Sequence, residues 1–297
     1  LHTAYRRQRQ MCIRDSAYFG DGENEAQMVY QFSLPPLVLH AVHSQNVRTL
    51  SQWAASLTLP STKTTWFNFL ASHDGIGLNP LRGILPESEI LSLVEKLQAE
   101  GALVNWKNNP DGTRSPYEIN VTYLDALSTR DSLDSQRIAR FILAHAVLLS
   151  FPGVPAVYIQ SILGSRNDYA GVERLGYNRA INREKYTAGQ IDSLLEDKNS
   201  LRSQVYCSLS QLIALRRAEK AFHPDSEAYF SASGKHVLKI VRVADCGEKV
   251  TALFNFSDGI QTVESDIHSG TELISGKDIT DKTLTLYPWQ VLWIKEN

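Results

Sequence analysis

The sequence predicts an α/β fold, in which a parallel sheet or barrel is followed by a small antiparallel β-sandwich. Over residues 17–224, short apolar runs alternate with amphipathic helical runs, as strands and helices do in a parallel sheet. These apolar runs do not alternate with polar residues, which is typical of strands that are covered on both faces. After residue 224, short alternating segments separated by turn residues indicate antiparallel strands.

Local patterns place the elements of residues 17–224. Apolar, β-prone runs predict three buried strands, at 27–32, 64–71 and 154–159. Apolar positions at helical spacing predict four helices, at 37–42, 50–56, 134–150 and 203–219. Pro35 and Pro36 open the first helix, because proline is tolerated in a first turn. Residues 160–198 are polar and rich in Gly and Asn, so we expect a loop region there.

Residues 79–128 are expected to form an inserted subdomain. Glu87 and Glu89 after Pro86 predict a helix that runs to about residue 100, and a polar turn follows at 108–112. Without this insertion, the remainder of 17–224 is much shorter than the roughly 250 residues of a typical eight-unit barrel. The chain is therefore expected to carry only part of a barrel, with about three strand–helix units.

Residues 225–297 are expected to form a separate all-β domain. The alternating segments predict strands at 236–243, 249–256, 261–263, 283–286 and 290–294. The domain organisation that we predict is therefore a partial barrel at 17–224 followed by a β domain at 225–297.

Residues 1–16 differ in character from the remainder of the chain. Four arginines crowd a stretch without helical or strand period, and the apolar segment of a secretory signal does not follow. The run RRQRQMCIRDS resembles translated adapter sequence, so we interpret residues 1–16 as a non-native N-terminus and expect the natural protein to continue upstream. A basic targeting arm is the alternative interpretation.

The composition excludes several classes of protein. A chain with 43% apolar and 21% charged residues is ordinary for a globular protein and argues against disorder. Its net charge of −2 argues against nucleic acid and anionic membranes as partners. The three cysteines lie far apart, which argues against a disulfide framework or a Cys-ligated zinc and favours a reducing, cytoplasmic location. We expect neither a metal nor a cofactor.

The segment Ser72-His73-Asp74-Gly75 directly follows the predicted strand at 64–71. In a parallel barrel, residues that leave the carboxyl end of a strand point into the mouth of the active site, so His73 and Asp74 could bind a polar substrate. The alternative is a structural turn, because Asp-Gly is a common turn sequence. A Ser-His-Asp triad is excluded, since neighbouring residues on an extended chain point in opposite directions.

Two further sets of residues give weaker signals. His40 and His43 have helical i,i+3 spacing, but no third metal ligand accompanies them, so we expect a surface pair. Arg179 and Arg183 lie in a predicted loop after the last barrel strand, where a guanidinium could bind sugar hydroxyls, a carboxylate or phosphate. Surface salt bridges are the alternative for both arginines.

Several motifs together resemble a known family. The run FNFLASHDGIGL (67–78) is similar to the fourth signature region of glycoside hydrolase family 13, the α-amylase superfamily. The runs AYFGDGENEA (17–26), PYEIN (116–120), NRAINR (178–183) and PWQVLW (288–293) resemble the sucrose phosphorylase branch of that family, which includes phosphorylases for sucrose, sucrose 6'-phosphate, glucosylglycerol and glucosylglycerate. The resemblance covers about residues 17–297. It implies the C-terminal part of a (β/α)8 TIM barrel with an inserted subdomain, followed by the small β domain.

The resemblance also implies a reaction and a set of residues. The reaction is retaining glucosyl transfer from a small α-glucoside to inorganic phosphate, which gives α-glucose 1-phosphate without a cofactor. Asp74 matches the transition-state-stabilising aspartate, and His73 matches the histidine that hydrogen-bonds the glucosyl ring. Arg183, or alternatively Arg179, matches an arginine near the bound glucose. Tyr117 and Glu118 match the mobile loop at the acceptor and phosphate site, where many family members carry Gln in place of Glu118.

The resemblance implies that the family's nucleophile Asp and acid/base Glu lie at the ends of the fourth and fifth barrel strands, with the Glu shortly before residues 18–20. At that place this chain reads MCIRDS, and no GFRxDA-like run occurs in it. Asp15, in the stretch interpreted as non-native, is no substitute. We therefore expect this polypeptide alone to be inactive and poorly folded. A family 13 hydrolase or transglucosylase, and a non-catalytic sugar-binding homologue, are the alternative interpretations.

Overall fold

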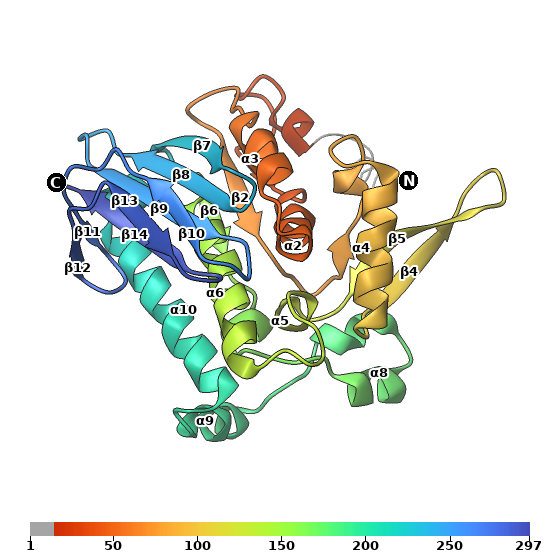
Figure 1. Cartoon of the computed structure of the whole chain (residues 1–297). Coiled ribbons are helices and arrows are strands. Elements are labelled where there is room, and N and C mark those ends of the chain that lie inside the picture. The colour runs from red at the N-terminus through yellow and green to blue at the C-terminus, as the bar shows by residue number, and fades with distance from the viewer. Residues whose placement is uncertain (1–14) are drawn as a thin grey trace.

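A three-stranded parallel sheet lies at the centre of the first part of the molecule (Figure 1). The computed structural model describes residues 15–297, so the interpretation of residues 1–16 falls almost wholly outside the described residues. The sheet has the order β1 (Met28–Tyr30), β2 (Thr65–Phe69) and β6 (Val154–Ala156), and each pair is parallel. All three predicted strands are thus confirmed in place, although they are shorter than predicted.

The prediction that these strands are covered on both faces is wrong. Met28 and Tyr30 on β1 are 46% and 50% exposed, whereas Val29 between them is buried. The buried and half-buried residues of β2 also alternate. Within the described residues, β1 and β6 are the two edges of the sheet, so fewer elements cover it than the apolar sequence suggests. The half-covered face carries a cluster of mutually contacting rings, formed by Tyr30, Phe32, Phe67 and Phe69.

The four predicted helices are confirmed. They are α2 (Leu34–Ser44), α3 (Arg48–Ala55), α6 (Asp134–Ser150) and α10 (Leu201–Ala218). The predicted loop region at 160–198 is instead largely helical, with α7 (Ile159–Ile162), α8 (Tyr169–Leu175), η3 (Asn178–Asn182) and α9 (Ala188–Glu196). Side-chain caps explain part of this difference. Asp168 caps α8, and Thr187 forms a capping box with Gln190 at the start of α9.

The insertion contains a helix and a small antiparallel sheet. The predicted helix is confirmed as α4 (Glu87–Ala99). The polar turn is the tip of a hairpin between β4 (Leu103–Asn108) and β5 (Arg114–Asn120), two strands that the sequence did not indicate. β5 also pairs with the short β3 (Ile76–Gly77), which directly follows the predicted Ser-His-Asp-Gly segment. Figure 1 shows that the hairpin tip projects from the body of the molecule. Short helical turns lie in the insertion at η2 (Asn79–Leu81) and α5 (Tyr123–Ala126), and another, η1 (Asp15–Phe19), precedes β1.

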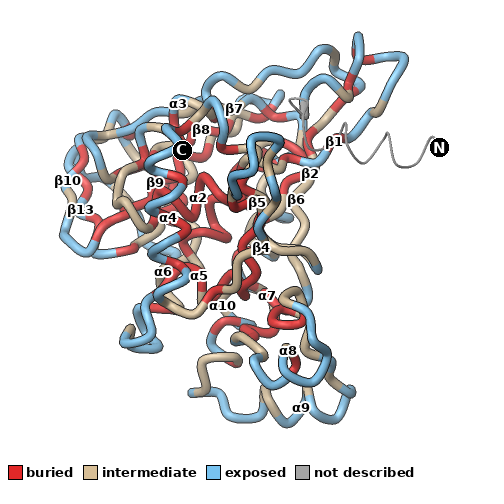
Figure 2. The backbone as a smooth tube through the Cα atoms, turned by 90° about the vertical axis from the view of Figure 1, so that its right-hand side faces the viewer, coloured by how far each residue is buried: buried red, intermediate tan, exposed pale blue. Residues whose placement is uncertain are grey.

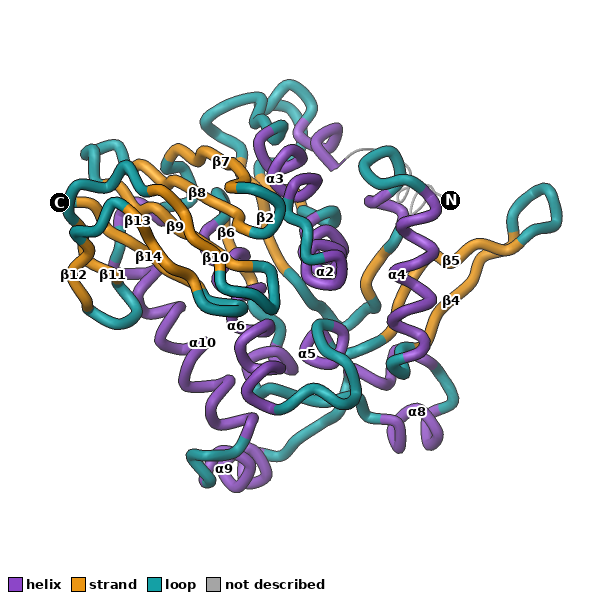
Figure 3. Tube along the Cα trace, in the orientation of Figure 1, coloured by secondary structure: helices purple, strands orange, loops and turns teal. Residues whose placement is uncertain are grey.

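The C-terminal part is antiparallel, as predicted. After η4 (Lys220–Phe222), a six-stranded sheet has the order β12-β11-β14-β9-β8-β7, and a two-stranded sheet is formed by β10 and β13. The strands are β7 (Glu227–Ser233), β8 (Val237–Val243), β9 (Lys249–Asn255), β10 (Gln261–Glu264), β11 (Gly270–Glu272), β12 (Lys277–Ile279), β13 (Thr283–Leu286) and β14 (Val291–Glu296). The sequence did not indicate β7, β11 and β12. Figure 3 shows the strands of this part beside helix α10.

One hydrophobic core runs from the helices into the C-terminal sheet. It contains Phe141 and Val147 of α6, Leu209 of α10, and Ile240 and Phe254 of the sheet, all buried. Figure 2 shows buried stretches, in red, both in the helices and in the C-terminal strands. A second, smaller core lies between the six-stranded and two-stranded sheets. The sheet is therefore covered by helices through one core and by the short strand pair through the other. The division into domains at residue 224 stays a prediction.

A buried arginine ties this sheet to the first part of the chain. Arg242 on β8 is completely buried and donates to backbone carbonyls, among them those of Ser150 at 2.9 Å and His223 at 2.7 Å. Burial, together with the charge of Arg216, lowers the pKa of Arg242 to about 9. Arg216 on α10 in turn donates to the carbonyl of Gly153 at 3.1 Å. The two arginines thus fix the segment that joins α6 to β6.

The predicted surface pair of histidines is instead drawn into the fold: His40 is buried and His43 is half-buried. His40 is 8% exposed and lies 2.9 Å from the Glu89 carboxylate, and His43 donates from Nε2 to the carbonyl of Ala126 at 2.6 Å. Their helix, α2, packs into the core on most sides, which the i,i+3 spacing alone does not reveal.

Among the described residues, no group of three or more potential ligands could hold a metal ion. In the same part of the chain, no helix is long and apolar enough to cross a membrane.

We predict that the protein loses stability as the pH falls from about 6.5 towards 4. Burial lowers the pKa of His43 and of His145 to about 4, from 6.5. Between these two pH values the histidines are protonated in the unfolded chain but not in the folded chain. Their contribution to the free energy of unfolding is complete above pH 6.5 and is lost as the pH falls through about 4. In urea titrations at several pH values, H145N should reduce the slope of the unfolding free energy against pH by up to ~1.4 kcal/mol per unit.

The exposed His268 provides the control, because H268N should keep the wild-type slope. Equal slopes in H145N and the wild type would contradict the prediction.

Candidate active site

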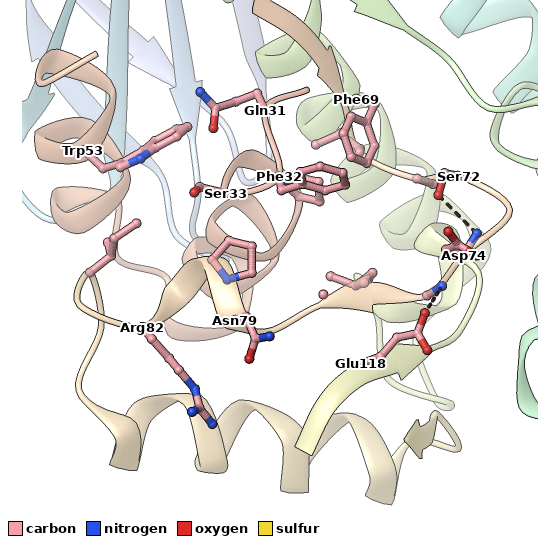
Figure 4. A pocket seen from close by; sticks show the side chains of 18 of the residues that line it. Gln31, Phe32, Ser33, Trp53, Phe69, Ser72, Asp74, Asn79, Arg82 and Glu118 are labelled. Carbon is pink, nitrogen blue, oxygen red and sulfur yellow. Dashed lines mark hydrogen bonds between the residues drawn. The ribbon is translucent and has the colours of Figure 1, made fainter. Parts of the chain in front are cut away.

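A cleft of about 1380 Å³ opens at the carboxyl ends of β1 and β2, against the insertion. Figure 4 shows Phe32 and Phe69 from the strand ends on one side of it and Glu118 of β5 on another. Of the six residues predicted for the site, five line this cleft: His73, Asp74, Tyr117, Glu118 and Arg179. The sixth, Arg183, contacts two of them through hydrogen bonds. The structure thus gathers residues from three distant parts of the chain at one place.

The loop that carries Asp74 is held by hydrogen bonds on both sides. It follows β2, and the backbone N–H of Asp74 donates to Ser72 Oγ at 3.1 Å. From η3, the Asn182 amide donates to the carbonyls of Ser72 and Asp74, each at 3.1 Å. The side chain of Asp74 remains 43% exposed. The loop is therefore fixed while the carboxylate stays accessible from the cleft.

Gly75 is required by close packing. Its backbone N–H donates to Glu118 Oε1 at 2.9 Å. A Cβ at this position would lie 2.6 Å from the carbonyl oxygen of Ile119 and 2.7 Å from Cγ of Glu118. The Asp-Gly pair therefore serves as more than a turn, because only glycine lets β5 approach the loop so closely.

Two arginines bind the Asp74 carboxylate. Arg179 Nη1 lies 2.7 Å from Asp74 Oδ1, and Arg183 Nη2 lies 3.3 Å from the same oxygen. Arg183 also donates from Nε to the carbonyl of His73 at 2.5 Å. The imidazole of His73 is 71% exposed, with Nε2 3.8 Å from Asp74 Oδ1. The arginines that the sequence offered as alternatives therefore both contact the same carboxylate.

Glu118 lies beneath this group. Its carboxylate is 5% exposed, lies 2.9 Å from Arg179 Nη2, and accepts a hydrogen bond from the Asn105 amide at 2.7 Å. Burial lowers the pKa of Arg179, but the hydrogen bond and charge of Glu118, followed by the charge of Asp74, outweigh it, so that its pKa is raised. Tyr117, the neighbour of Glu118 on β5, is half-buried at the cleft.

Sequence reasoning missed the amides and the tyrosine that support this group. Asn182 is 5% exposed, and Asn178 donates to the Asn105 side chain at 2.7 Å. Tyr158 donates to the carbonyl of Asn182 at 3.1 Å, and burial raises its pKa, as does the charge of Asp74, whereas Arg183 lowers it. Both asparagines belong to the NRAINR motif, so that motif was the available signal, although it gave no hint of which carbonyls they would bind.

Curated proteins with similar sequences are phosphorylases. The chain is 67% identical, over 94% of its length, to a glucosylglycerate phosphorylase of Escherichia coli, and it covers 50% of that protein. It is 43% identical, over 94% of its length, to a glucosylglycerate phosphorylase of Allomeiothermus silvanus, of which it covers 49%. It is 30% identical, over 72% of its length, to a sucrose phosphorylase of Agrobacterium vitis, of which it covers 42%. The chain thus spans about half the length of the curated relatives it matches. No family model matches it.

Solved structures give the same fold. The sucrose 6F-phosphate phosphorylase from Thermoanaerobacter thermosaccharolyticum superposes with a TM-score of 0.68 at 21% identity, covering 91% of this chain and 49% of that one. The α-amylase from H. orenii superposes with a TM-score of 0.63 at 13% identity, covering 96% and 52%. The predicted α/β fold class, part of a TIM barrel with an antiparallel C-terminal part, is confirmed.

The chain therefore has the fold that these phosphorylase and α-amylase structures share. Sequence similarity adds a narrower statement: the homologues of the chain are glucosylglycerate and sucrose phosphorylases, from the branch of glycoside hydrolase family 13 that the sequence motifs resemble.

We predict that G75A is destabilised by about 1–3 kcal/mol, the usual cost of overpacking, because its methyl group would collide with β5. Urea unfolding measures this effect. G189A is the matched control, since a Cβ at Gly189 meets nothing within 4 Å and the residue lies in helix α9. A G75A protein as stable as G189A would show that the approach of β5 to the loop is not as close as described.

Proposed function

We propose that the protein is a phosphorylase of the sucrose phosphorylase type. It would transfer a glucosyl group from a small α-glucoside to inorganic phosphate with retention, giving α-glucose 1-phosphate. The single observation that supports this most is the Asp74 carboxylate, half-exposed at the cleft and bound by two arginines at the end of a parallel strand. The names of the relatives with 67% and 43% identity favour glucosylglycerate as the donor. A cytoplasmic location belongs to this proposal, and no cofactor is needed.

In this proposal, Asp74 stabilises the transition state. Retaining glucosyl transfer passes through an oxocarbenium-like state, in which positive charge develops on the sugar. Asp74 contacts both arginines through Oδ1, so Oδ2 is left to face a sugar hydroxyl. An ionised carboxylate that is already fixed in place favours the developing charge without reorganisation.

The neighbouring residues would bind the two substrates. His73 is exposed beside Asp74 and suits a hydrogen bond to the glucosyl ring, and Arg183 lies close to the same position. Tyr117, with the arginines, would receive phosphate, for which guanidinium groups are well suited. A phosphate oxygen then attacks the anomeric carbon as the bond between glucose and the enzyme's nucleophile breaks. The chemistry also needs a nucleophile and an acid/base about 5–5.5 Å apart, and we assign neither role to a residue of this chain.

We predict that turnover of glucosylglycerate depends on phosphate and on Asp74. The assay measures the glucose 1-phosphate that is released by this chain or by any longer form of the protein that contains it. We expect no release by this chain alone. D74N should lower turnover by roughly 10²–10³-fold, because the positive charge on the sugar in the transition state loses the carboxylate that stabilises it. The exposed Asp131 gives the control, and D131N should keep the wild-type rate.

Two outcomes would contradict the proposal. Equal donor consumption without phosphate would indicate a hydrolase or transglucosylase. Glucose binding without any turnover, in every form tested, would indicate a non-catalytic sugar-binding protein.

A further inference from the structure

We infer that Glu118 is a positioning residue, which acts through Arg179 and the Gly75 amide and does not itself touch the acceptor or phosphate. The inference replaces the ligand-binding role that the family resemblance implies for Glu118. Its kinetic consequences rest on the proposed function, whereas its structural consequences do not.

The hydrogen-bond donors around Glu118 occupy all the acceptor sites of its carboxylate. Oε1 accepts from the Gly75 N–H at 2.9 Å and lies 2.9 Å from Arg179 Nη2. Oε2 accepts from the Asn105 amide at 2.7 Å and from Arg179 Nε at 3.3 Å. A carboxylate offers about four lone-pair sites, and four donors occupy them here. With the side chain 5% exposed, a ligand in the cleft finds no acceptor on Glu118.

Glu118 also fixes the orientation of Arg179. Two nitrogens of the planar guanidinium face the Glu118 carboxylate, so the third nitrogen, Nη1, is directed at Asp74 Oδ1, 2.7 Å away. A guanidinium held by two parallel contacts cannot rotate freely about its plane. Glu118 itself is held by the pairing of β5 with Gly77 and Asn105. The position of β5 thus determines, through Arg179, the position of the Asp74 carboxylate that the proposed chemistry needs.

Charge makes the two residues depend on each other. A buried carboxylate without a partner is strongly unfavourable, so Glu118 needs Arg179. Arg179, in turn, bridges two carboxylates, and Asp74 shares it with Glu118. Removing Glu118 would leave Arg179 free to swing towards the cleft and would release the Gly75 amide, so the Asp74 loop would lose support at two points.

The kinetic test uses whichever form of the protein catalyses phosphorolysis, with E118A, E118Q and the control E173A. Glu173 is exposed on α8 and outside the cleft. E118A should lower kcat by roughly 10–100-fold, the loss expected for a displaced catalytic group, and any rise in KM for phosphate through the displaced Arg179 should accompany that loss. E118Q, whose amide oxygen can still accept from Gly75, should recover part of kcat. A rise in KM for phosphate or donor with unchanged kcat would overturn the inference, since that is the behaviour of a ligand-binding residue.

The second test needs no activity and uses this chain or any longer form of the protein that contains it. Amide hydrogen exchange at Gly75 should accelerate by roughly tenfold in E118A, the change expected when one charge-assisted hydrogen bond is lost. It should stay near the wild-type rate in E118Q and E173A. An unchanged Gly75 rate in E118A would overturn the inference. If no form of the protein shows phosphorolysis, the proposed function fails, and the exchange result alone decides whether Glu118 positions the loop.

Discussion

The candidate site depends on one guanidinium between two carboxylates. Arg179 contacts Asp74 with one nitrogen and Glu118 with the other two, and it comes from a segment more than a hundred residues away from Asp74. Such bidentate contacts are among the stronger polar interactions in proteins, and they have strict geometry. The loop at 72–75, the strand β5 and the turn η3 must therefore all be in place before the aspartate faces the cleft.

The remainder of the fold supplies these three elements. The parallel strand β2 delivers the loop at its carboxyl end, and β5 approaches that loop because Gly75 has no side chain. Segment 150–153, which leads into β6, is held by Arg242 and Arg216 from the C-terminal part. Since one core continues from α6 into the six-stranded sheet, the β strands contribute to the framework on which the site rests.

Local patterns in the sequence were sufficient for the three parallel strands and the long helices, but not for β5 or η3. The bounds of α6 matched the prediction, and the place of Asp74 followed from the end of a predicted strand. Non-local contacts were not accessible in this way. The spacing of His40 and His43 shows that they share a helix face, but not that this face packs against Glu89 and Ala126. Likewise, nothing local in NRAINR says that Arg179 and Arg183 reach the same carboxylate, or that Glu118 is covered by four donors.

A crystal structure of this chain tests the bridging arginine most directly. If Arg179 organises the site, its guanidinium will lie between the two carboxylates, with Nη1 within hydrogen-bond distance of Asp74 and Nη2 beside Glu118. The free oxygen of Asp74 will then face the cleft. A guanidinium turned into solvent, with Asp74 directed away from the cleft, would contradict this description of the site.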